Sequence, residues 1–342
     1  MKAAFWYGPE DLRLIDAEIP QLGPSEVLVK IGVALTCGTD FKFFRRGHAV
    51  LAKTIPAPFG HEMAGTITAV APDVQNFKIG DRVVASNSAP CGSCFFCLKD
   101  QMNLCENLEF LNGAFAEYIR IPRKIVEKNL YKLPDRLAFR DAASAEPLAA
   151  ALHAIEQLQI MSGEVVCIIG SGPGGLMLVQ LAKLKGARVI CLARNSEKLE
   201  LAQRLGADHI VSTLKVKDIQ KEIREMSNGG RGPDIVIEAA GQPSTWELAV
   251  SLVRKGGRVS FYGGCQNDTS VTLDTHKIHY EQLQLSGVFH HTPHYFFEAL
   301  NLIATGKIKI APLIENEKRL SEITQVFRRN TQDTPLKVAI VP

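Results

Sequence analysis

The chain has 342 residues, which is more than one ordinary domain needs and suits about two domains. Hydrophobic residues make up 46% of the chain, enough to form a buried core in each domain. The 39 Lys and Arg residues nearly balance the 36 Asp and Glu residues, so the composition lacks the basic excess typical of nucleic-acid-binding proteins. We therefore expect no nucleic-acid partner.

The N-terminal segment does not have the pattern of an export signal, because Asp11, Asp16 and Glu18 precede any long apolar stretch. The longest apolar stretch, residues 165–182, is divided by a glycine-rich turn and does not suit a membrane span. Four of the eight cysteines crowd into residues 91–105, and in a reducing compartment such a cluster favours metal over disulfides. We expect a cytoplasmic protein without a membrane partner.

The first 150 residues contain short strand-like runs separated by Gly and Pro. Residues 26–33, 65–70 and 81–85 are the clearest of these runs. Their alternation and the intervening turn residues predict antiparallel, barrel-like β structure. Residues 146–160 then carry apolar side chains at helical spacing and mark a change of character.

Strand and helix patterns alternate from residue 165 onward. Buried-strand runs occupy residues 165–169, 188–192, 208–211, 234–238 and 258–262. Such alternation implies right-handed crossovers and a doubly wound parallel sheet. After about residue 285 the chain returns to the first domain, because residues 295–342 are too few to fold separately.

A glycine-rich loop joins the first of these strands to a helix, with the sequence Gly170-Ser-Gly172-Pro173-Gly174-Gly175. The first glycine permits a tight turn, the second lets the backbone approach a pyrophosphate, and the last allows close helix–strand packing. The helix N-terminus would offer N–H groups to the phosphates. This context favours dinucleotide binding over an ordinary structural turn.

The end of the second strand lacks the carboxylate that usually holds an adenosine ribose. Arg194 stands there instead, and its guanidinium can bind a 2′-phosphate. We therefore expect NADP to be preferred over NAD. The alternative is that Arg194 is a solvated surface residue.

The cysteine cluster, a lobe near residues 91–105, consists of Cys91, Cys94, Cys97 and Cys105. This short spacing lets one loop surround a tetrahedral ion with four thiolates and leaves no open position, which predicts a structural zinc. An iron–sulfur cluster would also accept four cysteines, but the spacing differs from common ferredoxin patterns. Unligated thiols are the remaining alternative.

Several separate segments match one family in wording and order. They are Cys-Gly-Thr-Asp at 37–40, Gly-His-Glu at 60–62, Gly-Asp-Arg-Val at 80–83, the cysteine lobe, Glu-Pro-Leu-Ala at 146–149 and the glycine loop. Nearly the whole chain resembles the zinc-containing medium-chain alcohol dehydrogenases, in particular the sorbitol and threonine dehydrogenase branch. The resemblance implies an α/β fold, with a GroES-like β-rich catalytic domain beside a Rossmann cofactor domain.

The resemblance also implies a second, catalytic zinc, making two per chain. Cys37 and His61 would bind it, Glu62 would be the neighbouring ligand, and Glu146 would be a further ligand directly or through water. Such a site keeps a position open for a small alcohol or carbonyl substrate, whose oxygen the zinc polarises while hydride passes to or from nicotinamide. Thr39 resembles the family's proton-relay hydroxyl, and its alternative is a satisfied turn hydroxyl.

The expected domain boundaries follow from the same resemblance. Residues 1–150 and 286–342 would form the catalytic domain, and residues 151–285 the cofactor domain. We expect further cofactor contacts from Ala239, Gly263 and Val288. The family resemblance also suggests a homodimer or homotetramer.

The chain departs from sorbitol dehydrogenases around the substrate pocket. Phe43 stands where those enzymes carry a tyrosine, and His290-His291 replaces an Arg-Tyr pair. These three residues are candidate pocket residues, although the histidines could instead be capping residues. The basic loop with Lys42, Arg45, Arg46 and His48 suggests an anionic substrate, such as a phosphorylated polyol or a sugar acid, unless it is a solvated surface.

Two other functions are alternatives to alcohol oxidation. One is an NADPH-dependent aldehyde or ketone reductase, and the other is a nucleotide-sensing protein on a dehydrogenase fold. Loss of the zinc ligands would indicate the sensor or a zinc-free quinone reductase, but Cys37, His61, Glu62 and Glu146 are all present.

Overall fold

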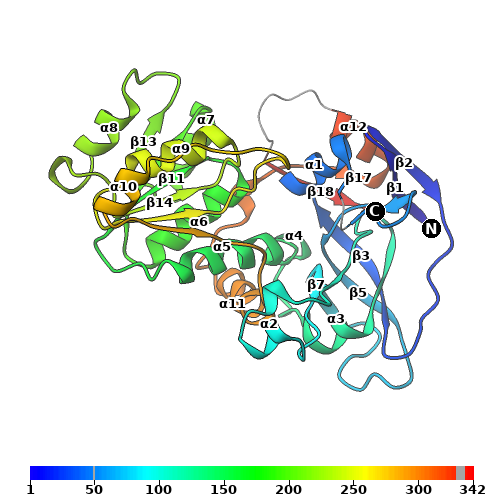
Figure 1. Ribbon diagram of the computed structural model, residues 1–342. Coiled ribbons are helices and arrows are strands. Elements are labelled where there is room, and N and C mark those ends of the chain that lie inside the picture. Colours follow the sequence, from blue (N-terminus) through cyan, green and yellow to red (C-terminus); the bar gives the residue numbers. More distant parts are fainter. Residues whose placement is uncertain (49–50, 329–335) are drawn as a thin grey trace. The chain divides into compact units, whose positions relative to one another are not determined.

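The computed structural model describes residues 1–48, 51–328 and 336–342. They form two compact units, and many of their elements are labelled in Figure 1. The first unit comprises Met1–Ala149, His291–Gly306 and Ile310–Pro342, and the second comprises Ala150–His290 and Lys307–Lys309. No helix within the described ranges is long and apolar enough to cross a membrane.

The first unit is mainly an antiparallel β structure. Its seven-stranded sheet has the order β10-β6-β5-β3-β18-β17, with β9 also paired to β3, and a three-stranded sheet has the order β2-β1-β4. The strands are β1 (Lys2–Gly8), β2 (Asp11–Asp16), β3 (Val27–Leu35), β4 (Ala57–Pro58), β5 (Glu62–Val70), β6 (Arg82–Ala85), β7 (Ser88–Ala89), β8 (Glu109–Phe110), β9 (Tyr118–Ile121), β10 (Leu130–Lys132), β17 (Ile314–Arg319) and β18 (Lys337–Val341). Because β18 pairs with β3, the last strand of the chain belongs to the same sheet as strands from its first half.

Short helices complete the first unit. They are α1 (Gly38–Arg46), α2 (Phe95–Leu98), α3 (Arg123–Lys128), α4 (Phe139–Ala142), α11 (Pro293–Ala304) and α12 (Ile323–Arg328). Helix α5 (Ala145–Gln157) contains the point at which the chain passes from the first unit to the second. That point follows Ala149, and the return follows His290, whereas the sequence suggested boundaries after residues 150 and 285.

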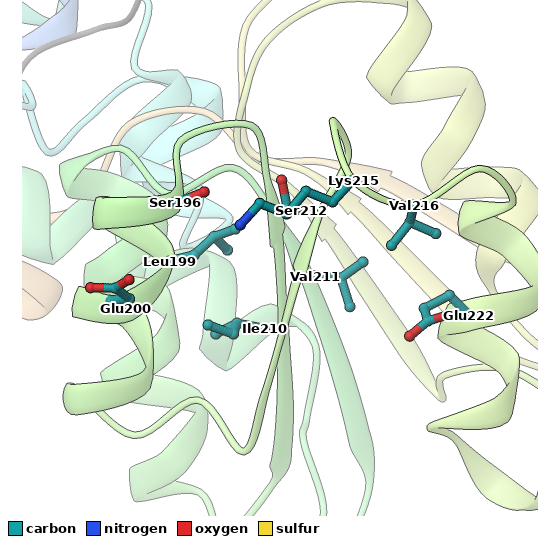
Figure 2. A pocket seen from close by; sticks show the side chains of 9 residues that line it. All are labelled: Ser196, Leu199, Glu200, Ile210, Val211, Ser212, Lys215, Val216 and Glu222. Atoms are coloured by element: carbon teal, nitrogen blue, oxygen red, sulfur yellow. The ribbon is translucent and has the colours of Figure 1, made fainter.

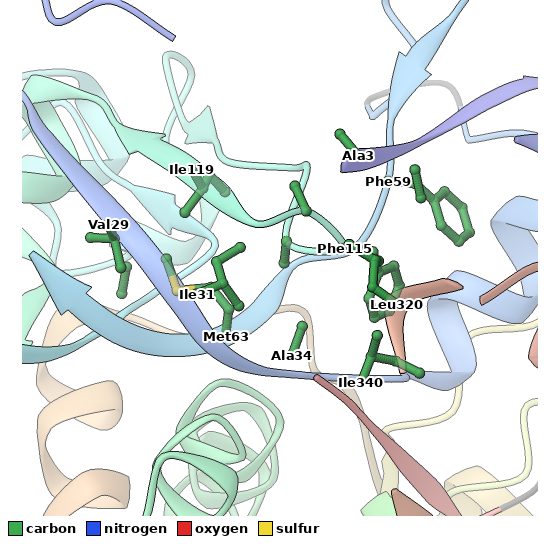
Figure 3. Close-up of a cluster of buried hydrophobic side chains, with 14 of the residues drawn as sticks. Ala3, Val29, Ile31, Ala34, Phe59, Met63, Phe115, Ile119, Leu320 and Ile340 are labelled. Carbon is green, nitrogen blue, oxygen red and sulfur yellow. The ribbon is translucent and has the colours of Figure 1, made fainter. Parts of the chain in front are cut away.

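The core of the first unit combines aliphatic strand residues with a cluster of aromatic rings (Figure 3). Phe327 lies with its ring centroid 4.8 Å from that of Phe41 and 5.1 Å from that of Phe59. Phe59 and Phe115 are both almost completely buried. Burial of each such side chain contributes about 1.5–3 kcal/mol, so this cluster fixes the turns that carry Cys37 and His61.

The second unit contains one six-stranded parallel sheet with the order β13-β12-β11-β14-β15-β16. Its strands are β11 (Val165–Ile169), β12 (Arg188–Ala193), β13 (His209–Ser212), β14 (Ile235–Glu238), β15 (Arg258–Phe261) and β16 (Gln284–Gly287). Every residue of β11 is buried, as expected for a central parallel strand covered on both faces. In chain order the arrangement is 3-2-1-4-5-6, which confirms the doubly wound sheet.

Helices connect the parallel strands of the second unit, namely α6 (Pro173–Leu184), α7 (Ser196–Arg204), α8 (Ile219–Glu225), α9 (Pro243–Leu252) and α10 (Thr275–Tyr280). Their N-terminal residues explain where several begin. Pro173 occupies the first helical position of α6, and the Asn195 side chain accepts a hydrogen bond from the N–H of Lys198 at the start of α7. These caps fix the helix starts directly after the strand ends.

Candidate metal centres and cofactor edge

The thiols of Cys91, Cys94, Cys97 and Cys105 come together within 4.8 Å of one another. The Sγ atoms of Cys91 and Cys97 are 3.9 Å apart, and those of Cys94 and Cys105 are 3.8 Å apart. A zinc ion with Zn–S bonds of about 2.3 Å places its sulfur ligands about 3.8 Å apart at tetrahedral angles. The four thiols therefore fit a closed tetrahedral zinc site.

Backbone N–H groups point at these sulfur atoms and favour their thiolate form. Hydrogen bonds from the N–H groups of Ser93 and Cys94 lower the pKa of Cys91 to about 5, whereas burial raises the pKa of Cys97 to about 12. The Lys128 ammonium donates hydrogen bonds of 2.8 and 2.7 Å to the carbonyls of Pro90 and Cys91 and fixes the start of the loop. A cation bound by the four sulfurs would stabilise the thiolates further.

A second donor set combines residues from distant parts of the first unit. The ligand atoms of Cys37, His61 and Glu62 all lie within 4.8 Å of one another. Cys37 precedes α1, and Glu62 begins β5, where it pairs with Leu35 of β3. Gly60 makes this approach possible: its φ is +92°, and a Cβ there would lie 2.5 Å from the Phe115 ring.

Asp40 orients the His61 ring. Its Oδ1 lies 2.9 Å from His61 Nδ1, although the angle departs from that of a regular hydrogen bond, and its Oδ2 accepts the N–H of Cys37 at 2.9 Å. Burial disfavours the charged ring, but Asp40 and Cys37 together raise the pKa of His61 well above its usual value. A carboxylate beside one ring nitrogen leaves the other available to a metal, which is a common arrangement around ligating histidines.

Glu62 forms a buried ion pair with Lys337, the first residue of β18. The Lys337 ammonium donates to both carboxylate oxygens, at 2.7 and 2.5 Å, and to the Thr36 carbonyl at 3.2 Å. Burial raises the pKa of Glu62 to about 7, although Lys337 acts in the opposite direction. Burial also disfavours the charged Lys337, but Glu62 and Cys37 more than offset it and the pKa of Lys337 is raised. The pair keeps the Glu62 carboxylate in a protein contact beside Cys37 and His61.

Glu146 lies in the first turn of α5 and is only 8% exposed. Its Oε1 accepts a hydrogen bond of 2.9 Å from Asn87 Nδ2 and lies 3.5 Å from His291 Nε2. Burial raises the pKa of Glu62 and Lys337 lowers it, and the charge of Glu146 raises it further. The two carboxylates therefore share one buried environment. Thr39 is half-buried in the first turn of α1, two residues after Cys37.

The residues expected to bind the cofactor lie along one edge of the parallel sheet in the second unit. Gly170, Arg194, Ala239 and Val288 each follow directly on the ends of β11, β12, β14 and β16, respectively. Gly263 stands two residues after the end of β15. This carboxyl edge is where doubly wound sheets bind nucleotides.

The glycine loop itself is shaped for close approach. Gly170 has a φ of +117°, and a Cβ on Gly175 would lie 2.0 Å from the Gly170 carbonyl oxygen. A Cβ on Gly172 would meet nothing within 4 Å, so that side of the loop is open. A side chain at Gly174 would approach the Tyr262 ring at 3.0 Å. The loop therefore requires glycine at its start and at its helix contact.

An open hollow of about 270 Å³ adjoins the segment after β12. Figure 2 shows the Lys215 side chain extending from the segment after β13 toward Ser196, the first residue of α7. The lining residues are Ser196, Leu199, Glu200, Ile210, Val211, Ser212, Lys215, Val216 and Glu222. Arg194, two residues before Ser196, is exposed.

Phe43, a candidate pocket residue, lies inside the first unit in this structure. Its side chain is 0% exposed, and its ring centroid lies 5.2 Å from that of Trp6 and 5.1 Å from that of Phe59. A phenylalanine lacks the hydroxyl that would draw a tyrosine toward water, and this ring packs in the aromatic core. His290 belongs to the second unit, where its carbonyl lies 2.9 Å from His153 Nδ1, whereas His291 is buried in the first unit.

Sequence reasoning missed three residues of the donor sets, namely Asp40, Asn87 and Lys337. Asp40 had a local signal, because an acid three residues after a helix cap commonly accepts the N–H of that cap. Asn87 and Lys337 had none: each acquires its partner from a segment at least 59 residues away in the chain. A lysine in a terminal strand is ordinarily expected at the surface.

The fold and the two donor sets are those of a metal-binding, dinucleotide-binding oxidoreductase, and comparison with known proteins identifies its family. Residues 23–135 match the alcohol dehydrogenase GroES-like domain, and residues 173–305 match the zinc-binding dehydrogenase family. The chain is 31% identical to sorbitol dehydrogenase of Bacillus subtilis (strain 168), covering 100% of this chain and 97% of that protein. It is 33% identical to D-arabitol-phosphate dehydrogenase of Enterococcus avium, covering 97% and 94%.

A solved structure agrees with these relatives. A zinc-binding dehydrogenase from Sinorhizobium meliloti 1021, crystallised with NADP, matches with a TM-score of 0.92 and 31% identity, covering 100% of this chain and 99% of that one. The chain belongs to the zinc-containing medium-chain alcohol dehydrogenase family. It is an enzyme of the dehydrogenase class.

Proposed function

We propose that the protein interconverts a secondary hydroxyl of a polyol or polyol derivative and the corresponding carbonyl, with NAD(P) as the hydride carrier. The observation that carries this proposal is the convergence of half-buried Cys37 with buried His61 and Glu62 on one point. When bound, zinc supplies Lewis-acid polarisation of the substrate oxygen, and nicotinamide supplies the hydride acceptor. The named relatives that act on polyols support the substrate class.

We infer two zinc ions per chain, one in each donor set. Cys91, Cys94, Cys97 and Cys105 would hold a structural ion, because four thiolates leave no position for substrate. Cys37 and His61 would hold the catalytic ion, with Asp40 fixing the orientation of the ring. Glu62 is the neighbouring carboxylate, and its ion pair with Lys337 competes with any bond to metal.

Within this site, Thr39 is the candidate for moving the substrate proton. Its hydroxyl can donate and accept at once, and it stands in the same helical turn as the metal ligand Cys37. Thr39→Val removes the hydroxyl while preserving the side-chain shape. Turnover should fall by about 10²-fold or more while both metals and the cofactor still bind.

We propose that NADP is preferred over NAD. Arg194 follows the second strand of the sheet, no carboxylate occupies that turn, and Lys215 extends toward Ser196 nearby. A guanidinium suits a 2′-phosphate because it offers several donors in one plane. Arg194→Ala should weaken NADP about tenfold and leave NAD unchanged, which fluorescence titration of the two cofactors would measure.

A more specific form of this proposal is that the substrate carries a phosphate or carboxylate group. Lys42, Arg45 and Arg46 are exposed on α1, the helix that follows Cys37, and a cationic helix attracts anionic substrates. The similarity to a polyol-phosphate dehydrogenase supports the same reading. Carbonyl reduction by NADPH would use the same site, and the donor sets disfavour a non-catalytic sensor.

The assembly expected for this protein is a homodimer or homotetramer. Light scattering of the purified chain would measure its mass directly. A monomer at working concentration would contradict this part of the proposal and leave the site unaffected.

Initial rates at the nicotinamide absorbance band would test the activity. Neutral polyols, secondary alcohols, sugar acids and phosphorylated polyols would each be combined with NAD and with NADP. Turnover restricted to anionic substrates would support the cationic helix, and turnover of neutral polyols would assign those cations to the solvated surface. No turnover by protein with two bound zinc ions would contradict the proposal.

A further inference from the structure

The carboxylate of Glu146 is held by the protein rather than placed among the other metal donors. The ligand atoms of Cys37, His61 and Glu62 form one group within 4.8 Å, and Glu146 instead falls in a group with His291. Asn87, between β6 and β7, donates a hydrogen bond of 2.9 Å to Glu146 Oε1. The carboxylate therefore lies next to the first group without joining it.

His291 faces three oxygen atoms with a single ring nitrogen. Its Nε2 lies 3.3 Å from Asn87 Oδ1, 3.5 Å from Glu146 Oε1 and 3.5 Å from Ser86 Oγ. Asn87 Oδ1 and an ionised carboxylate oxygen can only accept hydrogen bonds, so Nε2 must carry hydrogen to satisfy them. Asn87 is thus bridged on both sides, donating to Glu146 through Nδ2 and accepting from His291 through Oδ1.

The three side chains are buried in the first unit. Asn87 and Glu146 are each 8% exposed, and His291 is 2% exposed. The His291 ring also packs near Phe296, with 5.8 Å between centroids, so its position is fixed by α11 as well. A hydrogen-bonded carboxylate in such surroundings has few alternative positions, because leaving would strand buried donors.

We propose that Asn87 and His291 form a clamp that keeps the Glu146 carboxylate from binding the metal at Cys37 and His61, so that one coordination position stays open for substrate. This inference rests on the proposed catalytic zinc. His291 acts here as a positioning residue, since its contact is with Glu146 and not with reacting atoms. Releasing the clamp would let Glu146 compete with the substrate oxygen for the open position.

Cobalt substitution combined with steady-state kinetics would test the clamp. His291→Ala should change the visible absorption of Co²⁺ at the Cys37 site as a carboxylate joins it, and raise KM by about 10- to 100-fold with a smaller change in kcat. His291→Gln, which keeps a side-chain N–H donor, should restore much of the wild-type behaviour. His294→Ala, three residues away at an exposed position of α11, is the matched control and should change neither readout.

The dependence on Glu146 separates a clamp from a general structural role. In a Glu146→Ala background, His291→Ala should produce no further change in the cobalt spectrum or in KM. An equal change in both backgrounds, or an unaltered spectrum in His291→Ala, would overturn the clamp. Wild-type protein that takes up only the metal of the cysteine lobe would instead contradict the proposed function, so the two failures are distinguishable.

Discussion

The two donor sets of this protein are built in opposite ways. The cysteine lobe takes its four ligands from residues 91–105, and backbone N–H groups of the same loop contact the sulfur atoms. The groups at and beside the Cys37 site come from distant segments: Cys37 precedes α1, Glu62 begins β5, Lys337 begins β18 and Glu146 lies in α5. A short loop saturates an ion with its own thiolates, whereas separate elements bring different groups and can hold one of them back. The first arrangement suits a structural ion, and the second suits an ion with a position open to substrate.

The largest expected effect comes from removing the Cys37 thiol at the Cys37 site. Cys37→Ala should reduce turnover at least about a thousandfold, or roughly 4 kcal/mol of transition-state stabilisation, because His61 and Glu62 alone hold the ion poorly. Metal content should fall from two ions per chain to one, while cofactor titration stays unchanged. Cys265→Ala removes a thiol from the second unit and should keep both ions. Retained turnover in Cys37→Ala would contradict the assignment of Cys37 as a ligand of the catalytic metal.

Removing one thiol of the cysteine lobe should reduce the stability of the protein and leave turnover largely unchanged. Cys94→Ala should lower the free energy of unfolding by about 4–5 kcal/mol through loss of a structural metal, and leave one ion bound at Cys37. Calorimetry and metal analysis would measure both. Ser93→Ala alters the neighbouring position in the same turn and should leave the metal bound. If Cys94→Ala lost both ions at once, the two donor sets would not be independent.

The buried ion pair of Glu62 with Lys337 gives a third test. Lys337→Met should destabilise the protein by about 3–5 kcal/mol, because it leaves the Glu62 carboxylate buried without its cation. Urea unfolding at neutral pH would measure the loss. The double variant Glu62→Gln/Lys337→Met should recover most of it. A single variant as stable as wild type would mean that another group compensates Glu62.

Asp234 in the second unit is a buried carboxylate to compare with Glu62. The groups that stabilise its charge are all protein groups. Burial alone would raise its pKa, but the N–H of Val165, Asn228 and Arg254 more than offset this and hold the pKa of Asp234 below its usual value. A depressed folded-state pKa stabilises the fold above about pH 4 and the benefit disappears as pH falls through the folded value.

Asp234→Asn should therefore cost about 1.5–3 kcal/mol at pH 7, and the difference from wild type should shrink below about pH 4. Unfolding measured at several pH values would follow this convergence. The exposed ion pair of Lys2 with Asp16 is the control, and Asp16→Asn should leave the free energy of unfolding nearly unchanged, because solvent screens this pair. A pH-independent loss at Asp234 would assign its role to shape alone.

Local patterns in the sequence determined much of this protein. The spacing of Cys91, Cys94, Cys97 and Cys105 predicted one donor set, since ligands within a single loop cannot lie far apart. The alternation of strand and helix patterns from residue 165 predicted the parallel sheet. The glycine loop predicted a tight strand–helix turn, where the φ of +117° at Gly170 and the close contact at Gly175 both favour glycine. Resemblance to a family supplied Cys37, His61 and Glu62.

Only the tertiary structure decided what surrounds those groups. Lys337 reaches Glu62 because β18 pairs with β3, and His291 reaches Glu146 and Asn87 across more than a hundred residues. Phe43 packs into the core because Trp6 and Phe59 close around it. The physical reason is that a buried charge takes its state from its nearest neighbours in space, and for these residues the neighbours come from other parts of the chain.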